Sequence, residues 1–191
     1  MKLLSIQIGQ ARRAKFGERT LLTAGNKRGV NGNVAVLPLG LMGDEQADLS
    51  VHGGLDKAVY AYPSEHYAFW QQTRAANGVN SFDNSLPHGS LGENLTLSGL
   101  LETQLWVGDR LQFANCTLRV TQPREPCFKF NATMGFSAAS KLMANSGFCG
   151  VYLAVDEPGS LIAGEAFKLL PGRRGVSVLQ LFNAKARKHL R

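Results

Sequence analysis

The succession of short strand patterns along the chain is the sequence feature that most limits how this protein can fold. Residues 116–121 show the pattern most clearly, because Cys116, Leu118 and Val120 alternate with polar residues at the period of a half-buried strand. Strand-like patterns occupy residues 3–8, 34–39, 59–62, 94–97, 104–107, 110–113, 116–121, 148–155 and 166–170, and helical patterns occupy 63–72, 137–144 and the segment from 176. We therefore predict a mainly β (α+β) fold, a closed or partly closed barrel with a few peripheral helices.

The 191-residue chain has no break in composition, so we predict one main domain. We place this domain at residues 1–172. Residues 173–191 should form a short basic helix, because Leu179, Phe182 and Ala186 recur at helical spacing.

Basic charge is concentrated at the C-terminal end of the chain. Of the 21 Lys and Arg residues, seven lie from Lys168 onward without any acidic residue, which leaves 14 basic against 14 acidic residues in the remainder. The net charge of +7 thus reflects a tail rather than a basic face, so we do not expect nucleic acid as a partner. The tail could attract an acidic redox protein, or it could be a solvated helix end.

Cysteine content and hydropathy indicate the compartment. Cys116, Cys127 and Cys149 are odd in number and lack CxxC spacing, which argues against a disulfide framework. The N-terminal apolar stretch is too short for a signal peptide, and no run reaches membrane-spanning length. We therefore expect a cytoplasmic protein that does not associate with membranes.

Residues 122–129 are the strongest candidate for chemistry. Two prolines should hold Cys127 in a rigid loop, because proline fixes its own φ and restricts the residue before it. Arg124 and Lys129 are close to Cys127 in sequence, and positive charge favours a thiolate, which is a nucleophile and a soft metal ligand. A buried structural cysteine flanked by two surface cations is the alternative interpretation.

Two other loops could contribute ligand contacts. His52 precedes Gly53 and Gly54, whose backbone can approach a ligand closely and turn its N–H groups toward it. A turn role for this histidine is the alternative. The amide of Asn94, in a Gly-Glu-Asn turn, could hydrogen-bond a polar ligand. The common phosphate, zinc and hydrolase motifs are absent from the sequence.

Four blocks of sequence carry a family resemblance, at residues 43–60, 62–67, 92–95 and 122–129. Together they resemble the MOSC-domain family, and within it the stand-alone YiiM-like group, over residues 3–171. The resemblance implies a β-barrel-like fold that binds the molybdenum cofactor. It also implies that Cys127 is the protein ligand to molybdenum and hence the catalytic residue, and a thiolate suits that role as a soft ligand.

Under this resemblance, residues near Cys127 would bind the rest of the cofactor. Arg124 and Lys57 could supply charge to the phosphate of the pterin, while Gly53 and Gly54 could supply backbone donors. The other residues expected to contact the cofactor are His52, Asn94, Gln122 and Lys129.

YiiM-like proteins are similar in activity to the mitochondrial amidoxime-reducing proteins. The resemblance therefore implies reduction of N-hydroxylated small molecules, such as 6-N-hydroxylaminopurine, to amines. Electrons would come from a separate flavoprotein or flavodoxin-like protein, since no flavin, haem or iron–sulfur motif is visible. Many members of the group continue into a helical appendage, of which this chain has room for only a stub. A homodimer and a monomer both remain open.

Two further functions are compatible with the same residues. A persulfide on Cys127 would make the protein a sulfur carrier, and MOSC domains also occur in cofactor sulfurases. This chain has no room for the pyridoxal-phosphate lyase domain of those enzymes, so sulfur would have to come from another protein. A non-catalytic module that binds or stores the cofactor is the other alternative.

Overall fold

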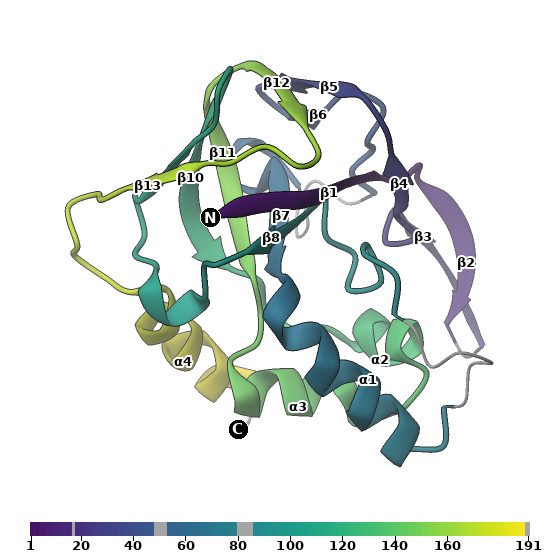
Figure 1. The fold of residues 1–191 in the computed structure, drawn as a ribbon. Coiled ribbons are helices and arrows are strands. Elements are labelled where there is room, and N and C mark those ends of the chain that lie inside the picture. The colour runs from purple at the N-terminus through teal and green to yellow at the C-terminus, as the bar shows by residue number, and fades with distance from the viewer. Residues whose placement is uncertain (17, 48–52, 80–85, 190–191) are drawn as a thin grey trace.

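Strands gather on one side of the molecule and helices on the other (Figure 1). The computed structural model describes residues 1–16, 18–47, 53–79 and 86–189. The strands are β1 (Lys2–Ile8), β2 (Arg12–Phe16), β3 (Arg19–Thr23), β4 (Arg28–Val30), β5 (Asn33–Leu37), β6 (Gly40–Leu41), β7 (Val59–Pro63), β8 (Leu95–Ser98), β9 (Arg110–Gln112), β10 (Thr117–Pro123), β11 (Val151–Glu157), β12 (Gly159–Ile162) and β13 (Lys168–Leu170). The helices are α1 (Tyr67–Ala76), α2 (Phe128–Met134), α3 (Ala139–Ser146) and α4 (Val178–His189), with single turns η1 (Leu55–Lys57), η2 (Ser64–His66) and η3 (Glu102–Gln104).

One large mixed sheet dominates the strand side. Its order is β13-β9-β10-β11-β7-β8-β1-β4, and its strands pair antiparallel except for the parallel pair β7 and β8. A second sheet contains β12, β5 and β6, and β2 and β3 form a separate hairpin. The predicted mainly β, α+β class is therefore confirmed.

The large sheet is not closed into a barrel, contrary to the expectation from sequence. Among the described strands, its edges β13 and β4 do not pair with each other. Lys2 forms a bridge with Ala166, and the Leu3 amide donates to the Glu165 carbonyl at 2.9 Å. From Lys168 onward the chain pairs with β9 instead. The segment 165–170 therefore contacts β1 first and β9 a few residues later. It connects the two edge regions of the sheet without a continuous ladder of hydrogen bonds between them.

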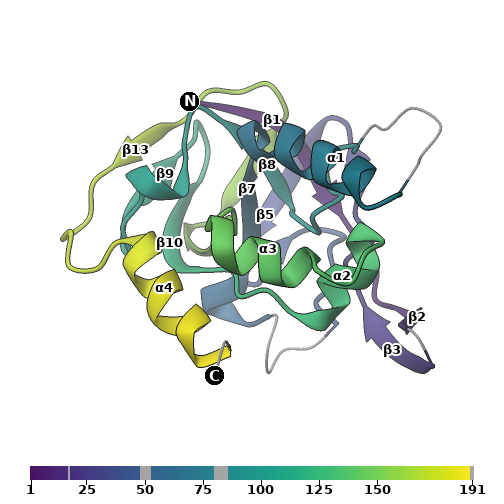
Figure 2. The same ribbon diagram turned by 90° about the horizontal axis from the view of Figure 1, so that it is seen from below.

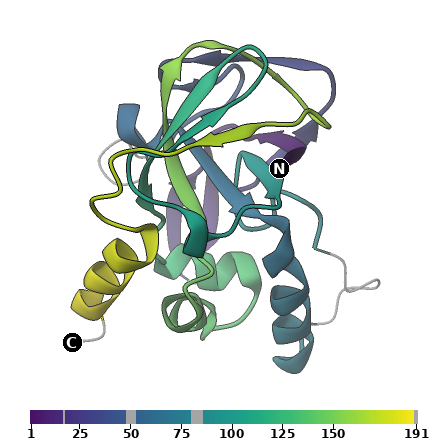
Figure 3. The same cartoon turned by 60° about the vertical axis from the view of Figure 1, so that its left-hand side comes forward.

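The core has two parts. Buried apolar side chains such as Leu3 and Ile6 of β1 fill the space among the sheets. Beneath them, the fully buried Trp70, Phe130 and Phe182 join the helices to the large sheet. In the view from below, α3 lies between α1 and α4, and α2 follows on the side of α3 away from α4 (Figure 2). The blue α1 and the yellow α4 lie at opposite ends of the helical layer (Figure 3).

The strand predicted at residues 104–107 is wrong. The single turn η3 ends at Gln104, whose side chain accepts a hydrogen bond from the Leu101 amide at 2.8 Å. Residues 105–107 contribute only an isolated bridge between Trp106 and Ser177 and the start of a turn. The carboxylate of Asp109 accepts from the Trp106 amide at 3.0 Å. Within 104–107, a local side-chain acceptor therefore takes the Trp106 amide, which a continuous strand could have paired. Helix α2, which begins directly after Cys127, is not among the predicted helices.

The predicted C-terminal helix forms as α4. Its apolar face is buried through Val178, Phe182 and Ala186, and the helix packs against β10 and η3. None of the described helices is long and apolar enough to cross a membrane.

Candidate functional site

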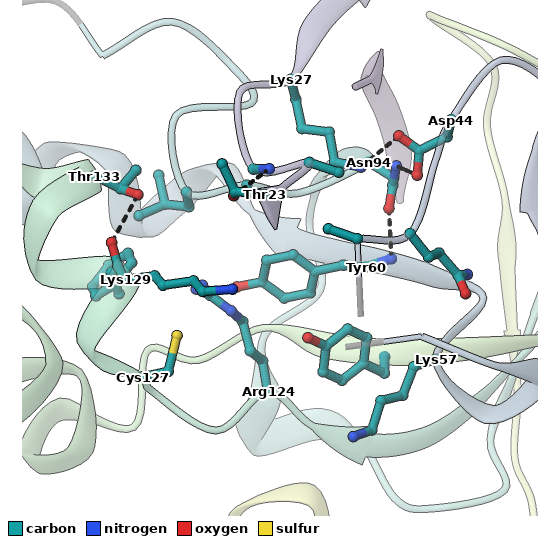
Figure 4. A pocket seen from close by; sticks show the side chains of 18 of the residues that line it. Thr23, Lys27, Asp44, Lys57, Tyr60, Asn94, Arg124, Cys127, Lys129 and Thr133 are labelled. Atoms are coloured by element: carbon teal, nitrogen blue, oxygen red, sulfur yellow. Dashed lines mark hydrogen bonds and ion pairs between the residues drawn. The ribbon is translucent and has the colours of Figure 1, made fainter. Parts of the chain in front are cut away.

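A pocket brings together the end of β3, the turn η1, strand β7 and helix α2 (Figure 4). Its volume is about 120 Å³. That is roughly ten times the space that one water requires, so a small organic ligand fits the pocket better than a single water or ion. The lining includes the cations Lys27, Lys57, Arg124 and Lys129, the acids Asp44 and Glu45, the aromatic residues Tyr60, Phe130 and Tyr152, and the thiol of Cys127.

Cys127 lies in the loop between β10 and α2. Pro123 ends the strand, and Cys127 has an extended backbone (φ −132°, ψ 165°) just before the first helical residue. The Cys127 carbonyl accepts from the Phe130 amide at 2.9 Å, which begins the helix. The free thiol is half-buried and lines the pocket. As the prolines suggested, the residue is kept out of the strand.

The other two cysteines have different surroundings. Burial, assisted by Glu165, raises the pKa of the Cys116 thiol to about 12. Burial also raises the pKa of Cys149 well above its usual value. Both side chains are buried and stay protonated at neutral pH, as expected for structural cysteines. Cys127 is the one cysteine of the three that reaches the pocket.

Arg124 supplies a cation with an unused donor. Its guanidinium carbon lies 5.1 Å from the centre of the Tyr60 ring and 5.0 Å from that of Phe130. This geometry is favourable for cation–π attraction. Its Nη1 atom is buried and has no hydrogen-bond partner among the described residues. An unpaired buried donor is costly, so the site is ready for an acceptor from a ligand.

Two tyrosines beside Arg124 stay neutral. Burial raises the pKa of Tyr60 well above its usual value and raises that of Tyr152. The Tyr60 hydroxyl donates to the Cys149 carbonyl at 2.9 Å. Because neither phenol ionises near neutral pH, neither one cancels the charge of Arg124.

Lys27, Asp44 and Asn94 form a hydrogen-bonded network on another part of the lining. Lys27 Nζ is 2.5 Å from Asp44 Oδ1, and both side chains are less than a tenth exposed. Asp44 also accepts from the Gly9 amide at 2.7 Å and from Asn94 Nδ2 at 2.9 Å. Burial lowers the pKa of Lys27, although the attraction of Asp44 opposes this shift.

Asn94 uses its whole side-chain amide inside the protein. Its Oδ1 accepts from the Tyr60 amide at 3.1 Å, and its Nδ2 donates to the Gln7 carbonyl at 3.2 Å as well as to Asp44. The residue lines the pocket, and its amide joins β7, β1 and the loop after β6. This arrangement suits a role in shaping the pocket.

The predicted site residues fall into three groups. Those in the pocket are Lys57, Asn94, Arg124, Cys127 and Lys129. Gly53, Gly54 and Gln122 do not line it. Gly54 has a φ of +87°, and its amide donates at 2.8 Å to Gln46, which does line the pocket. His52 lies outside the described residues.

Two predicted cations approach the pocket from opposite sides. Lys57 Nζ lies 5.7 Å from the centre of the Tyr152 ring, and Lys129 Nζ donates to the Leu22 carbonyl of the β2–β3 hairpin at 3.2 Å. Lys27, which lies in a Gly- and Asn-rich loop, and Asp44 line the pocket without having been predicted as site residues. Only the resemblance block that begins at residue 43 could have drawn attention to Asp44.

The fold and the pocket together define a class of protein: a strand-rich α+β domain with a free thiol beside a buried cation that has a spare donor. Such a pocket suits an anionic ligand that also carries a partner for sulfur. The chain belongs to the MOSC domain family, whose model matches residues 48–168.

Individual relatives agree with this assignment. YiiM of Escherichia coli (strain K12) is 36% identical over 149 residues, which are 78% of this chain and 64% of that protein. A protein of Gibberella moniliformis named as a reductase is 30% identical over 169 residues, which are 88% of this chain and 29% of that protein. The crystal structure of YiiM from Geobacillus stearothermophilus matches with a TM-score of 0.76 and 26% identity, over 98% of this chain and 84% of that one. The predicted resemblance to stand-alone YiiM-like proteins is confirmed.

Proposed function

We propose that this protein binds the molybdenum cofactor in the pocket, with Cys127 as the protein ligand to molybdenum, and uses it to reduce N-hydroxylated small molecules to amines. The observation that carries the proposal is that one pocket is lined by both Cys127, with its free thiol, and Arg124, whose Nη1 has no hydrogen-bond partner among the described residues. Membership of the MOSC family supports the choice of cofactor. The reductase name of the Gibberella relative supports a reducing activity.

The residues present fit this cofactor. Cys127 offers sulfur, which suits a soft transition metal. Arg124 offers an unpaired buried N–H to a phosphate oxygen, and a guanidinium matches phosphate geometry well. The ammonium groups of Lys57 and Lys129 add positive charge at the lining. The sulfur donor and the cations thus serve different parts of one ligand.

The reaction proposed here breaks the N–O bond of an N–OH group. Each turnover consumes one R–NHOH, two electrons and two protons, and it yields R–NH2 and water. The cofactor, when bound, would supply the two-electron chemistry. We assign the electrons to a separate flavoprotein or flavodoxin-like donor in the reducing cytoplasm. The protein would hold the metal through Cys127 and fix the anionic part of the cofactor through Arg124.

The test is the molybdenum and pterin content of the protein purified from a host that makes the cofactor. Wild type should contain both, and Cys127→Ala should lose molybdenum roughly tenfold or more, because even outer-sphere partners of a metal ligand are worth 10–100-fold. Cys116→Ala is the matched control, since it removes a buried thiol that does not line the pocket. Wild type should also convert 6-N-hydroxylaminopurine when given a competent donor.

The remaining outcomes separate the alternatives. Absence of molybdenum from both wild type and Cys127→Ala would overturn the proposal. Molybdenum in wild type without turnover would leave a binding or storage module. A stable persulfide on Cys127, seen by mass spectrometry, would instead identify a sulfur carrier.

A further inference from the structure

The C-terminal helix reaches the loop that carries Cys127. Lys185 of α4 donates from Nζ to Glu125 Oε1 at 2.7 Å and to Gln122 Oε1 at 2.9 Å. These acceptors lie on either side of Arg124 in the sequence. One ammonium group therefore ties the end of β10 to the loop and spans the residue whose guanidinium enters the pocket.

Helix α4 is fixed in place by contacts that do not involve Lys185. Val178 and Phe182 are fully buried. The Val178 amide donates to the Leu105 carbonyl at 3.0 Å, and the Val107 amide donates to the Val176 carbonyl at 3.0 Å. The helix lies beside β10 (Figure 2). Lys185 therefore extends from an anchored element, and its bonds can restrain the loop.

The loop has modest backbone support near Arg124. The Arg124 amide donates to the Gly150 carbonyl at 3.4 Å, which is beyond the usual range for N–H···O bonds. The bonds from Lys185 are shorter and charge-assisted, so each is stronger than a neutral bond of the same kind. The side chains of Lys185 and Glu125 are 28% and 37% exposed, which limits their effect to that of a partly solvated pair.

We infer that Lys185 is a positioning residue, which holds the 124–127 loop so that Arg124 and Cys127 face the pocket. The consequence for catalysis rests on the proposed function, whereas the restraint itself does not. The C-terminal helix is then part of the site, and Gln122 serves the site by accepting from Lys185.

The test uses the full chain without cofactor, so that it does not depend on the proposed function. The rate at which iodoacetamide alkylates Cys127 at fixed pH is followed by mass spectrometry, with buried Cys116 and Cys149 as internal references. Lys185→Met should raise this rate roughly fivefold, the effect of losing a partly exposed ion pair. Lys185→Arg should restore it to within about twofold, since Arg can bridge the same two acceptors. Lys141→Met, on the exposed face of α3, is the matched control and should leave the rate unchanged.

A double-mutant cycle separates the ion pair from a general effect on the helix. Glu125→Gln should raise the rate in the same way, and the double variant Lys185→Met with Glu125→Gln should react no faster than the faster single variant. Additive single effects, an unchanged rate in Lys185→Met, or failure of Lys185→Arg to restore the rate would each overturn the inference.

A second measurement covers the case in which Lys185→Met perturbs folding. Amide hydrogen exchange should increase in peptides that cover residues 122–127 and stay unchanged in those that cover β1. Equal increases in both regions would show a loss of global stability and would refute the local role. If the loop is restrained as inferred but no molybdenum is found in the protein, the proposed function fails and the positioning role stands.

Discussion

Two walls of the pocket differ in how completely their polar groups are used. In the amide wall, formed by Lys27, Asp44 and Asn94, each side chain has at least one hydrogen-bond partner in the protein. The cysteine wall, formed by Arg124 and Cys127, has a buried Nη1 without a partner among the described residues and presents a free thiol. The side chains of the amide wall are therefore linked to one another without a ligand, whereas the cysteine wall has a buried donor that a ligand could pair.

The difference between the two walls indicates that the amide wall determines the shape of the pocket and that the cysteine wall binds the ligand. Buried polar groups that are fully paired rigidify a structure, so the amide wall should contribute stability and a fixed outline. An unpaired buried donor costs free energy until a ligand accepts from it. We therefore expect substitutions in the amide wall to affect unfolding, and substitutions in the cysteine wall to affect the bound ligand.

Asn94→Leu should give the largest change in stability. It would leave the Tyr60 amide and the Gln7 carbonyl without their present partner and remove a donor from Asp44. We expect a loss of about 3 kcal/mol in the free energy of unfolding, measured by urea denaturation. Asn145→Leu, the same change at an exposed position of α3, should stay within about 0.5 kcal/mol. Equal effects in the two variants would show that the amide wall is not specially stabilising.

Lys27→Met should change the pH dependence of stability. Burial places the folded pKa of Lys27 below its usual 10.5. At a pH between the folded pKa of Lys27 and 10.5, the unfolded chain still binds the proton that the folded protein has released. The free energy of unfolding therefore rises with pH there, by at most about 1.4 kcal/mol per pH unit. Below the folded pKa both states are protonated and this contribution is constant.

The measurement for Lys27 is the difference in unfolding free energy between wild type and Lys27→Met from pH 7 to 10. That difference should shift in favour of wild type as pH rises. Tyr60 and Tyr152 act in the opposite direction, because their raised pKa values make the unfolded chain release protons first. Both variants keep these tyrosines, so the difference isolates Lys27. A difference that is flat over this range would contradict the burial of the Lys27 charge.

The sequence predicted the cysteine wall better than the amide wall for a physical reason. Arg124 and Cys127 lie in one loop, whose prolines and charges can be recognised from a single stretch of residues. Lys27, Asp44 and Asn94 are distant in sequence and meet only when β1, β7 and the loop after β6 come together. A pattern within one stretch of sequence cannot predict contacts between residues that are so far apart in the chain.

The same distinction applies to the fold. Alternation predicted β10 because the strand shows its buried face within a few residues. It predicted β1 as a strand, but Leu3, Ile6 and Gln7 are the buried residues there, and the register shifts between Leu3 and Ser5. The open edge of the sheet depends on where the segment around Ala166 changes neighbours, which is a long-range choice. Gln122, a predicted cofactor contact, does not line the pocket and accepts from Lys185, more than sixty positions away in the chain.

Arg124→Met should have the smallest effect on unfolding and a large effect on the ligand. The substitution loses the attraction of the guanidinium to Tyr60 and Phe130, which is worth about 0.5–1 kcal/mol for each ring. It also removes an unpaired buried donor, whose relief is of similar size. The cofactor-free protein should therefore unfold within about 1 kcal/mol of wild type in urea, while the molybdenum and pterin content of protein from a cofactor-producing host falls.

Arg124→Lys keeps the charge and should retain more molybdenum and pterin than Arg124→Met, because it loses only the planar fork that matches phosphate. If Arg124→Met instead destabilised the cofactor-free protein as much as Asn94→Leu, Arg124 would serve the scaffold, and the contrast between the two walls would fail.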